Sequence, residues 1–294
     1  MTFNHVVRSS TLRWSTRQGR RSAALLFYCP ADMGKRHKQH SKPARHGKTD
    51  KENNSETQLR KGTEMIGIIG AMETEIAGIR ERMTAKKEKM ISGIKYVVGK
   101  LGGADTVTAV CGVGKVFAAV CAQTMILEYH PDIILNTGVA GALSPELSAM
   151  DIVVAEQTVQ YDMDTSPLGD PKGYISGIGI VYFEADKEAT AKLFDILVRH
   201  GNKAVKGVIA SGDRFVASDC LKNFITTEFN AIACEMEGAA IAQVCYVNKC
   251  RFAVLRAISD GADGLSYNEF CDKAAAVYVD VVNEFAEQYG DKNL

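Results

Sequence analysis

The chain has 294 residues, 46% of them hydrophobic, which is enough for a packed core in one large domain or two small ones. Its formal net charge of zero averages two unlike parts, because residues 1–64 carry 14 Lys and Arg against 5 Asp and Glu, and the remainder carries 21 against 30. The acidic remainder lacks the basic field that nucleic-acid binding requires, and no apolar run approaches the roughly 18 residues of a membrane span.

Cysteine and histidine usage argues against disulfide and metal chemistry. The eight cysteines form no C-x-x-C pair and are scattered through apolar runs, a pattern typical of reduced, buried thiols in a cytoplasmic protein. Four of the six histidines lie in residues 1–64, so only His130 and His200 remain for the acidic part. We therefore expect neither a histidine triad nor a metal site.

Residues 1–64 are expected to form a basic, disordered extension. The first 30 residues contain no acid and are rich in Arg, Ser and Thr, which also fits an organelle transit peptide, and the stretch that follows is polar. We favour a solvated leader or upstream sequence over a targeting segment. In that interpretation Met65 is the natural start, and residues 65–294 form a single domain.

From Met65 onward, predicted strands alternate with predicted helices. The strands are predicted at residues 65–70, 94–101, 105–111, 132–136, 151–155, 204–210, 232–234 and 252–258. The helices are predicted at residues 73–83, 116–129, 186–200, 218–229, 237–247 and 266–289, the last with a capping-box spacing from Ser266 to Glu269. Residues 157–179, punctuated by Gly and Pro, are predicted to form a functional loop.

This order of elements predicts an α/β fold, a three-layer sandwich in which helices flank a central twisted, mixed β-sheet. In such folds ligands bind where strands end in loops. Two apolar runs end in acids at such points: one in Glu235 and Glu237, the other in Asp260. Almost no basic residue accompanies these acids, so we expect the carboxylates to be paired, protonated or holding a ligand.

A simpler explanation of these acids is that they complement a helix dipole. Glu235 and Glu237 precede a predicted helix, and Glu73 begins another. Glu75, one turn deeper, is explained less well in this way. Together with Glu237 and Asp260, it supplies acids from three strand ends, which is the set needed to break a glycosidic bond: an acid for the leaving group, a base for water and an anchor for sugar hydroxyls.

Two glycine-containing stretches give weak signals for nucleotide binding. Gly67 and Gly70 follow an initial strand but lack the G-x-G-x-x-G spacing of a dehydrogenase. Residues 112–115 end in Gly-Lys, but the first glycine and the Ser or Thr of a phosphate loop are missing. We therefore set aside a dehydrogenase and an NTPase, and expect no cofactor.

Residues 65–290 resemble the 5′-methylthioadenosine/S-adenosylhomocysteine nucleosidases, a family within the superfamily of purine nucleoside and uridine phosphorylases. Six motifs carry the resemblance, at residues 68–75, 112–115, 136–141, 211–216, 234–237 and 256–260. The resemblance implies a nucleoside phosphorylase-like fold and hydrolysis of the N-glycosidic bond of both nucleosides with release of adenine, a step of methionine salvage. It also implies a homodimer, and the cysteine pattern places the protein in the cytoplasm.

The resemblance further implies roles at the sugar. Glu75 would be the base that activates water, and Asp260 the acid that protonates adenine at N7. Glu237 would hold the ribose hydroxyls, and Met236 would pack against the sugar. Gly141 would line the site beside the water.

At the base, the resemblance implies that Phe215 stacks on adenine and that the backbone of Val216 reads its edge. Arg256 would assist binding. Independently of the resemblance, Asp260 must be protonated near neutral pH to act as the acid, and we expect Ser259 and the bound base to tune its pKa. The chain departs from the family pattern at Val139, where many members have Ser, and at residues 160–162, where others have an aromatic-His-Asp run.

Two alternatives remain open at this point. A phosphorylase would use phosphate as the nucleophile, but the turn that carries Glu75 offers anions rather than the cations or N–H donors that phosphate requires. A non-catalytic nucleoside-binding module would not need both Glu75 and Asp260. For the homodimer, we expect the interface at residues 157–179 and on the apolar helix that begins at Val116.

Overall fold

The structure, a computed structural model, describes residues 64–259 and 267–290. The predicted extension lies outside these residues apart from Glu64, and so does the predicted cap at Ser266. Within the described ranges, no helix is long and apolar enough to cross a membrane.

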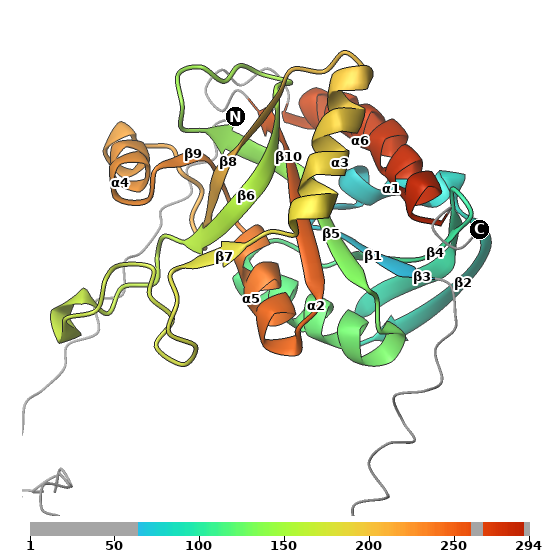
Figure 1. Cartoon of the computed structure of the whole chain (residues 1–294), viewed down its shortest axis with the longest axis horizontal. Helices are drawn as coiled ribbons and strands as arrows, with labels where there is room; N and C mark the ends of the chain where they lie inside the picture. Colours follow the sequence, from blue (N-terminus) through green and yellow to red (C-terminus); the bar gives the residue numbers. More distant parts are fainter. Residues whose placement is uncertain (1–63, 260–266, 291–294) are drawn as a thin grey trace, which may run out of the picture. The chain divides into compact units, whose positions relative to one another are not determined.

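The described strands pair into one mixed sheet in the order β10-β6-β8-β9-β5-β1-β4-β3-β2, with β7 beside β6 (Figure 1). They are β1 (Met65–Gly70), β2 (Thr84–Ile91), β3 (Ile94–Leu101), β4 (Ala104–Val110), β5 (Ile133–Ala142), β6 (Ile152–Gln160), β7 (Tyr182–Glu184), β8 (Ala204–Ser211), β9 (Ala231–Glu235) and β10 (Arg251–Ser259). Because β10 also pairs with β5, the strands β10, β6, β8, β9 and β5 close into a ring, and β1, β4, β3 and β2 extend from it as an open wing.

Helices cover both faces of the sheet, which confirms the predicted three-layer α/β fold. Among the described residues they are α1 (Glu73–Arg82), α2 (Lys115–Tyr129), α3 (Lys187–Arg199), α4 (Asp219–Phe229), α5 (Gly238–Asn248) and α6 (Tyr267–Gly290), with the single turn η1 (Ser166–Leu168). Helices α1, α3 and α6 lie on one face, and α2 and α5 on the other (Figure 1).

Strand β1 shows why the sheet is buried on both sides. Ile66 and Ile68 pack into the core beneath α1 and α6, whereas Ile69 points into the core beneath α2 and α5. Gly67 faces α2, and a Cβ atom there would lie 2.6 Å from the sulfur of Met125. The glycine therefore lets helix and sheet approach closely.

Polar caps fix the starts of two helices at the predicted positions. The carboxylate of Asp186 accepts a hydrogen bond from the Ala189 N–H at 2.9 Å and begins α3. The hydroxyl of Ser218 accepts one from the Leu221 N–H at 3.3 Å and begins α4. Helix α4 follows the loop at residues 212–217, so its cap also fixes where that loop ends.

The structure differs from the prediction in two strands that were missed and two that are longer than expected. Strand β2 lies at the edge of the wing, and all of its residues except Ile91 are exposed, so its sequence carries no periodic signal. The short strand β7 pairs with β6. Strand β6 continues to Gln160, and β5 continues through Gly138 and Gly141 because β10 pairs with it over that whole length.

Candidate active site

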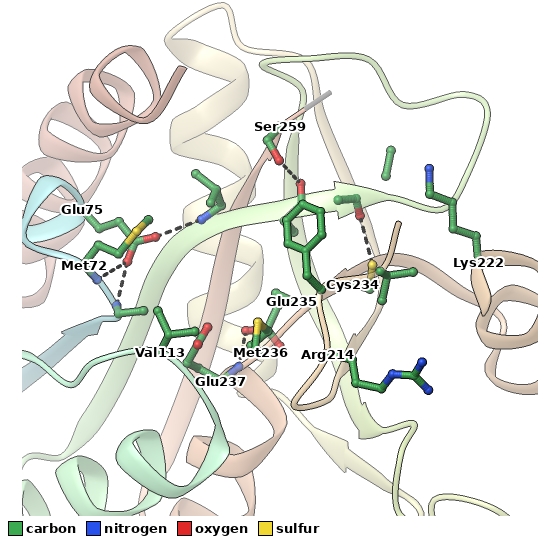
Figure 2. Close-up of a pocket in the computed structure, with 17 residues that line it drawn as sticks. Met72, Glu75, Val113, Arg214, Lys222, Cys234, Glu235, Met236, Glu237 and Ser259 are labelled. Atoms are coloured by element: carbon green, nitrogen blue, oxygen red, sulfur yellow. Dashed lines mark hydrogen bonds between the residues drawn. The ribbon is translucent and has the colours of Figure 1, made fainter. Parts of the chain in front are cut away.

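One pocket lies where the strands β1, β5, β9 and β10 end, as the fold class predicts (Figure 2). It is lined by Ala71, Met72, Glu75, Val113, Val139, Ala140, Gly141, Ala142, Arg214, Phe215, Val216, Lys222, Cys234, Glu235, Met236, Glu237 and Ser259. Seven residues predicted to act together are therefore in one place: Glu75, Gly141, Phe215, Val216, Met236, Glu237 and Ser259. Asp260, the predicted acid, follows Ser259 and lies outside the described residues.

Glu75 joins the start of α1 to strand β5. One carboxylate oxygen, Oε2, accepts hydrogen bonds from the N–H groups of Ala71 at 2.7 Å and Met72 at 3.0 Å. The other, Oε1, accepts one from Val139 N–H at 3.3 Å. Burial raises the pKa of Glu75 above its usual value, and the opposing effects of Arg256 and of these N–H groups are smaller. The pKa of this carboxyl group, which lines the pocket, is thus closer to neutral pH than that of an exposed glutamate.

Gly138 leaves the space that Glu75 occupies. A Cβ atom at this position would lie 2.7 Å from Oε1 of Glu75, closer than any ordinary contact allows. A side chain at residue 138 would therefore push the carboxylate away from β5. The position of Glu75 consequently depends on the glycine of the 136–141 motif.

Glu235 ends β9 and is fully partnered. Its Oε2 accepts hydrogen bonds from the N–H groups of Glu237 at 2.9 Å and Gly238 at 2.7 Å, and its Oε1 accepts one from the Ser211 hydroxyl. The guanidinium of Arg256 lies 2.5 Å from Oε2. Burial alone would raise the pKa of Glu235, but Arg256 and the hydrogen bonds outweigh it and hold the pKa below its usual value.

Arg256 lies behind the pocket rather than on its lining. Its side chain is almost fully buried in β10, where it pairs with Glu235 and donates to the side chain and the carbonyl of Asn136. We expected the acids to have almost no basic partner; for Glu235 that expectation is wrong. An arginine inside an apolar strand must find a buried acid, and this signal in residues 252–258 could have identified the ion pair.

Glu237, two residues after Glu235, has a different environment. It lies at the start of α5 without capping it, and Oε1 accepts a hydrogen bond from the Gly114 N–H at 2.8 Å, at the start of α2. Burial and the neighbouring Glu235 raise the pKa of Glu237 to about 7, against the opposing effect of Arg256. At the start of α5 the helix-dipole explanation therefore applies to Glu235, whose carboxylate binds the N–H groups there, whereas the carboxylate of Glu237 binds at the start of α2.

The opposite side of the pocket is formed by the loop between β8 and α4. Phe215 and Val216 lie on this loop, and the Phe215 ring is 73% exposed. Figure 2 shows Glu75 on one side of the pocket and Arg214 and Lys222 on the other. The pocket therefore has an acidic end and an end that carries an aromatic ring beside two cations.

One positioning residue had no signal in the sequence. The hydroxyl of Tyr278, on α6, donates to the carbonyl of Gly138 and accepts from the N–H of Ala257. It thereby links β5 and β10 just before both strands reach the pocket. Within the described part of the chain, no group of three or more His, Cys, Asp or Glu is placed to hold a metal.

Comparisons with known proteins show the family of the chain. Residues 65–287 match the family model described as the phosphorylase superfamily. A relative from Staphylococcus carnosus named 5′-methylthioadenosine/S-adenosylhomocysteine nucleosidase is 36% identical over 224 residues, which are 75% of this chain and 98% of the relative.

Solved structures show the same similarity. The nucleosidase of this name from Neisseria meningitidis, in complex with methylthio-immucillin-A, is 34% identical with a TM-score of 0.73, covering 76% of this chain and 99% of that one. A futalosine hydrolase from Helicobacter pylori is 33% identical with a TM-score of 0.73, covering 77% of this chain and 98% of that one.

Proposed function

The chain belongs to the 5′-methylthioadenosine/S-adenosylhomocysteine nucleosidases of the phosphorylase superfamily, and from that premise we propose which of its residues carry each step of the reaction. The enzyme is an N-glycosyl hydrolase. With water, it cleaves the bond between adenine and the 5-thio-ribose part of methylthioadenosine and adenosylhomocysteine, a step of methionine salvage and of recycling S-adenosylmethionine by-products.

Glu75 is proposed as the base that activates water. A general base works best when its pKa lies near the operating pH, and burial moves the pKa of Glu75 in that direction. Three N–H groups fix the carboxylate between α1 and β5, so its orientation is set before substrate arrives. The backbone N–H of Val139, not its side chain, makes the contact at the position where many family members have Ser.

Glu237 is proposed to hold the ribose hydroxyls, with Met236 packed against the sugar and Gly141 beside the water. Departure of adenine leaves positive charge on the sugar, and an anion in a water-poor pocket stabilises that charge as it develops. With Glu75 and Glu237 both lining the pocket, the acidic end supplies this stabilisation.

Asp260 is proposed to protonate adenine at N7, and Phe215 and Val216 to bind its ring and its edge. Ser259, which lines the pocket immediately before Asp260, would tune the acid; its hydroxyl donates to the Ala140 carbonyl at 3.2 Å. Arg256 acts on this site indirectly in our proposal, because its guanidinium is engaged by Glu235 and Asn136.

The observation that carries these roles is the convergence of Glu75 and Glu237 in the pocket that also contains Phe215. It disfavours phosphate as the nucleophile, since the phosphate would meet two carboxylates while Arg256 is already paired. It also disfavours a non-catalytic binding module, which needs no acid with a raised pKa at the pocket.

The test is adenine release from methylthioadenosine with and without phosphate, in the native enzyme and in Glu75→Gln. We expect release without phosphate, no stimulation by phosphate, and a loss of about 1,000-fold in kcat for Glu75→Gln. Glu73→Gln is the matched control, because Glu73 lies on the same helix but is exposed and paired with Arg80. Phosphate-dependent release, or equal activity of the two variants, would contradict the mechanism.

Futalosine is a second candidate substrate, favoured by the similarity to the Helicobacter pylori hydrolase. The same assay with futalosine tests it. A kcat/KM within about tenfold of that for methylthioadenosine would add it to the substrates, and no release would remove it.

We further propose that the enzyme is a cytoplasmic homodimer whose catalytic domain is residues 65–294. Apolar side chains are exposed on the first turns of α2, with Val116 73% and Phe117 58% exposed, and Leu168 in the 157–179 loop is 84% exposed. Sedimentation of the native chain and of Phe117→Glu tests the dimer. We expect a dimer and a monomer respectively, and a native monomer would refute the proposal.

The domain proposal rests on the family match, which begins at residue 65, and on relatives whose whole length corresponds to about three quarters of this chain. A chain that starts at Met65 should keep the kcat/KM of the full chain. A large loss would assign the extension a catalytic role.

A further inference from the structure

We propose that Lys115, Asp162 and Asp213 form a clamp that positions the loop of Phe215 and Val216 against Glu237. None of the three residues lines the pocket. The inference rests on the proposed function, specifically on adenine binding by Phe215 and Val216, and it identifies positioning residues for that binding.

The clamp is a closed set of contacts between three segments that are distant in the sequence. The ammonium group of Lys115 lies 2.6 Å from Oδ1 of Asp162, and the Lys115 N–H donates to Oδ1 of Asp213 at 2.7 Å. The Asp213 N–H in turn donates to Oδ2 of Asp162 at 2.9 Å. The start of α2, the residues after β6 and the loop after β8 are thus tied to one another.

The clamp is continuous with the acidic end of the pocket. Gly114, next to Lys115, donates its N–H to Glu237 at 2.8 Å, so two consecutive N–H groups hold Glu237 and Asp213. Gly114 has a φ of 102°, and a Cβ atom there would lie 3.1 Å from the Asp213 carboxylate. This backbone conformation favours glycine. Residues 114 and 115, the Gly-Lys pair that resembled the end of a phosphate loop, are thus explained by the conformation of Gly114 and by the ion pair of Lys115.

Burial indicates that the clamp, rather than packing of the ring, fixes the loop. The side chains of Lys115 and Asp162 are 19% and 22% exposed, whereas Phe215 is 73% exposed. The Tyr161 hydroxyl adds a hydrogen bond to the Arg214 carbonyl at 3.3 Å. Residues 160–162, where the chain has Gln-Tyr-Asp in place of aromatic-His-Asp, therefore contact this loop through Tyr161, which replaces the histidine, and through Asp162, which matches the pattern.

The predicted effect is on binding more than on the chemical step. A loop that holds adenine does so in both the ground state and the transition state, so loosening it raises KM and leaves kcat nearly unchanged. Adenine alone should report the same loss, because the free base has no sugar for Glu237 to bind.

The experiment measures adenine affinity by calorimetry, together with KM and kcat for methylthioadenosine. We expect Lys115→Met to raise both the adenine Kd and KM about tenfold with kcat within about threefold, as for loss of a partly buried ion pair. Lys115→Arg should restore most of the affinity, and Asp162→Asn should repeat the loss. Lys89→Met is the control, since it breaks an ion pair of the same 2.6 Å length to Glu128 at the other end of α2.

The results distinguish a failure of the clamp proposal from a failure of the proposed function. The clamp is overturned if Phe215→Ala weakens adenine binding while Lys115→Met and Asp162→Asn do not, or if Lys115→Met and Lys89→Met lower the melting temperature equally and leave Kd unchanged. If Phe215→Ala itself leaves Kd unchanged, the adenine-binding role of the loop is wrong and the clamp falls with it. A native chain that releases no adenine would refute the activity instead.

Discussion

The two carboxylates of the 234–237 motif lie two residues apart and are almost equally buried, at 7% and 6% exposed, yet their pKa values move in opposite directions. Glu235 belongs to a buried ion pair behind the pocket, with Arg256 and three hydrogen-bond donors. Glu237 borders the pocket, with one N–H donor and the negative charge of Glu235 nearby. Burial raises the pKa of both carboxylates, so the opposite directions of the two shifts come from the groups that surround each carboxylate.

Within this one motif, Glu235 therefore has a structural role, and Glu237 is available for chemistry in the pocket. A carboxylate with a cation and several donors stays charged and holds strands together, whereas one with a single donor is left able to exchange protons or bind a ligand. Glu75 accepts three N–H hydrogen bonds but forms no ion pair among the described residues, and burial raises its pKa as well. Three predictions test the contrast.

The largest expected effect is on the ion pair. Arg256→Met should lower the free energy of unfolding at pH 7 by about 4 kcal/mol, because Glu235 is left charged and unpaired inside the protein. Urea denaturation measures it. The double variant Arg256→Met with Glu235→Gln should recover a large part of the loss, since no charge then remains. A double variant as unstable as the single one would show that packing, not charge, accounts for the loss.

The next effect is the pH dependence of stability that Glu237 contributes. The folded state raises its pKa from 4.5 to about 7, so folded protein holds a proton that the unfolded chain releases in this range. The corresponding stabilisation, about 3 kcal/mol, is fully present below pH 4.5 and is lost as pH rises through 7.

Glu237→Gln should therefore reduce the decline of unfolding free energy between pH 5 and pH 8. Some decline should persist, because the pKa of Glu75 is also raised. The decline is measured from the midpoints of urea denaturation of the native chain and the variant at several pH values. Superimposable pH profiles would rule out Glu237 as the source.

The smallest effect is expected for Tyr278, which links β5 and β10, the strands that carry Arg256 and the Val139 N–H that binds Glu75. Tyr278→Phe should cost about 2 kcal/mol of stability, because it removes the buried hydroxyl that binds both the Gly138 carbonyl and the Ala257 N–H. It should also lower kcat by displacing β5 from Glu75. Tyr129→Phe is the control: the Tyr129 hydroxyl has no hydrogen-bond partner among the described residues, so its removal should change thermal stability little. Equal shifts in melting temperature would contradict the linking role of Tyr278.

The sequence predicted most of the elements and seven of the residues that line the pocket, because apolar periodicity and strand-end motifs are local signals. It did not predict β2, whose exposed lysines show no alternation, nor the extension of β5 through Gly138. The pairing of Glu235 with Arg256 and the bridge from Tyr278 depend on which strands become neighbours. Such contacts join residues 21 positions or more apart. An arginine inside an apolar strand is a local signal for the ion pair, whereas no local pattern indicates the bridge from Tyr278. The catalytic roles themselves stay predictions.

The open wing of the sheet ends in the edge strand β2. Among the described strands β2 pairs only with β3, so its other edge is open to a strand of another molecule, and such an edge invites aggregation. Lys86, Lys87 and Lys89 lie along it and are exposed, so a second copy would bring like charges together before any backbone hydrogen bonds formed. Polymerisation through the wing is thereby discouraged.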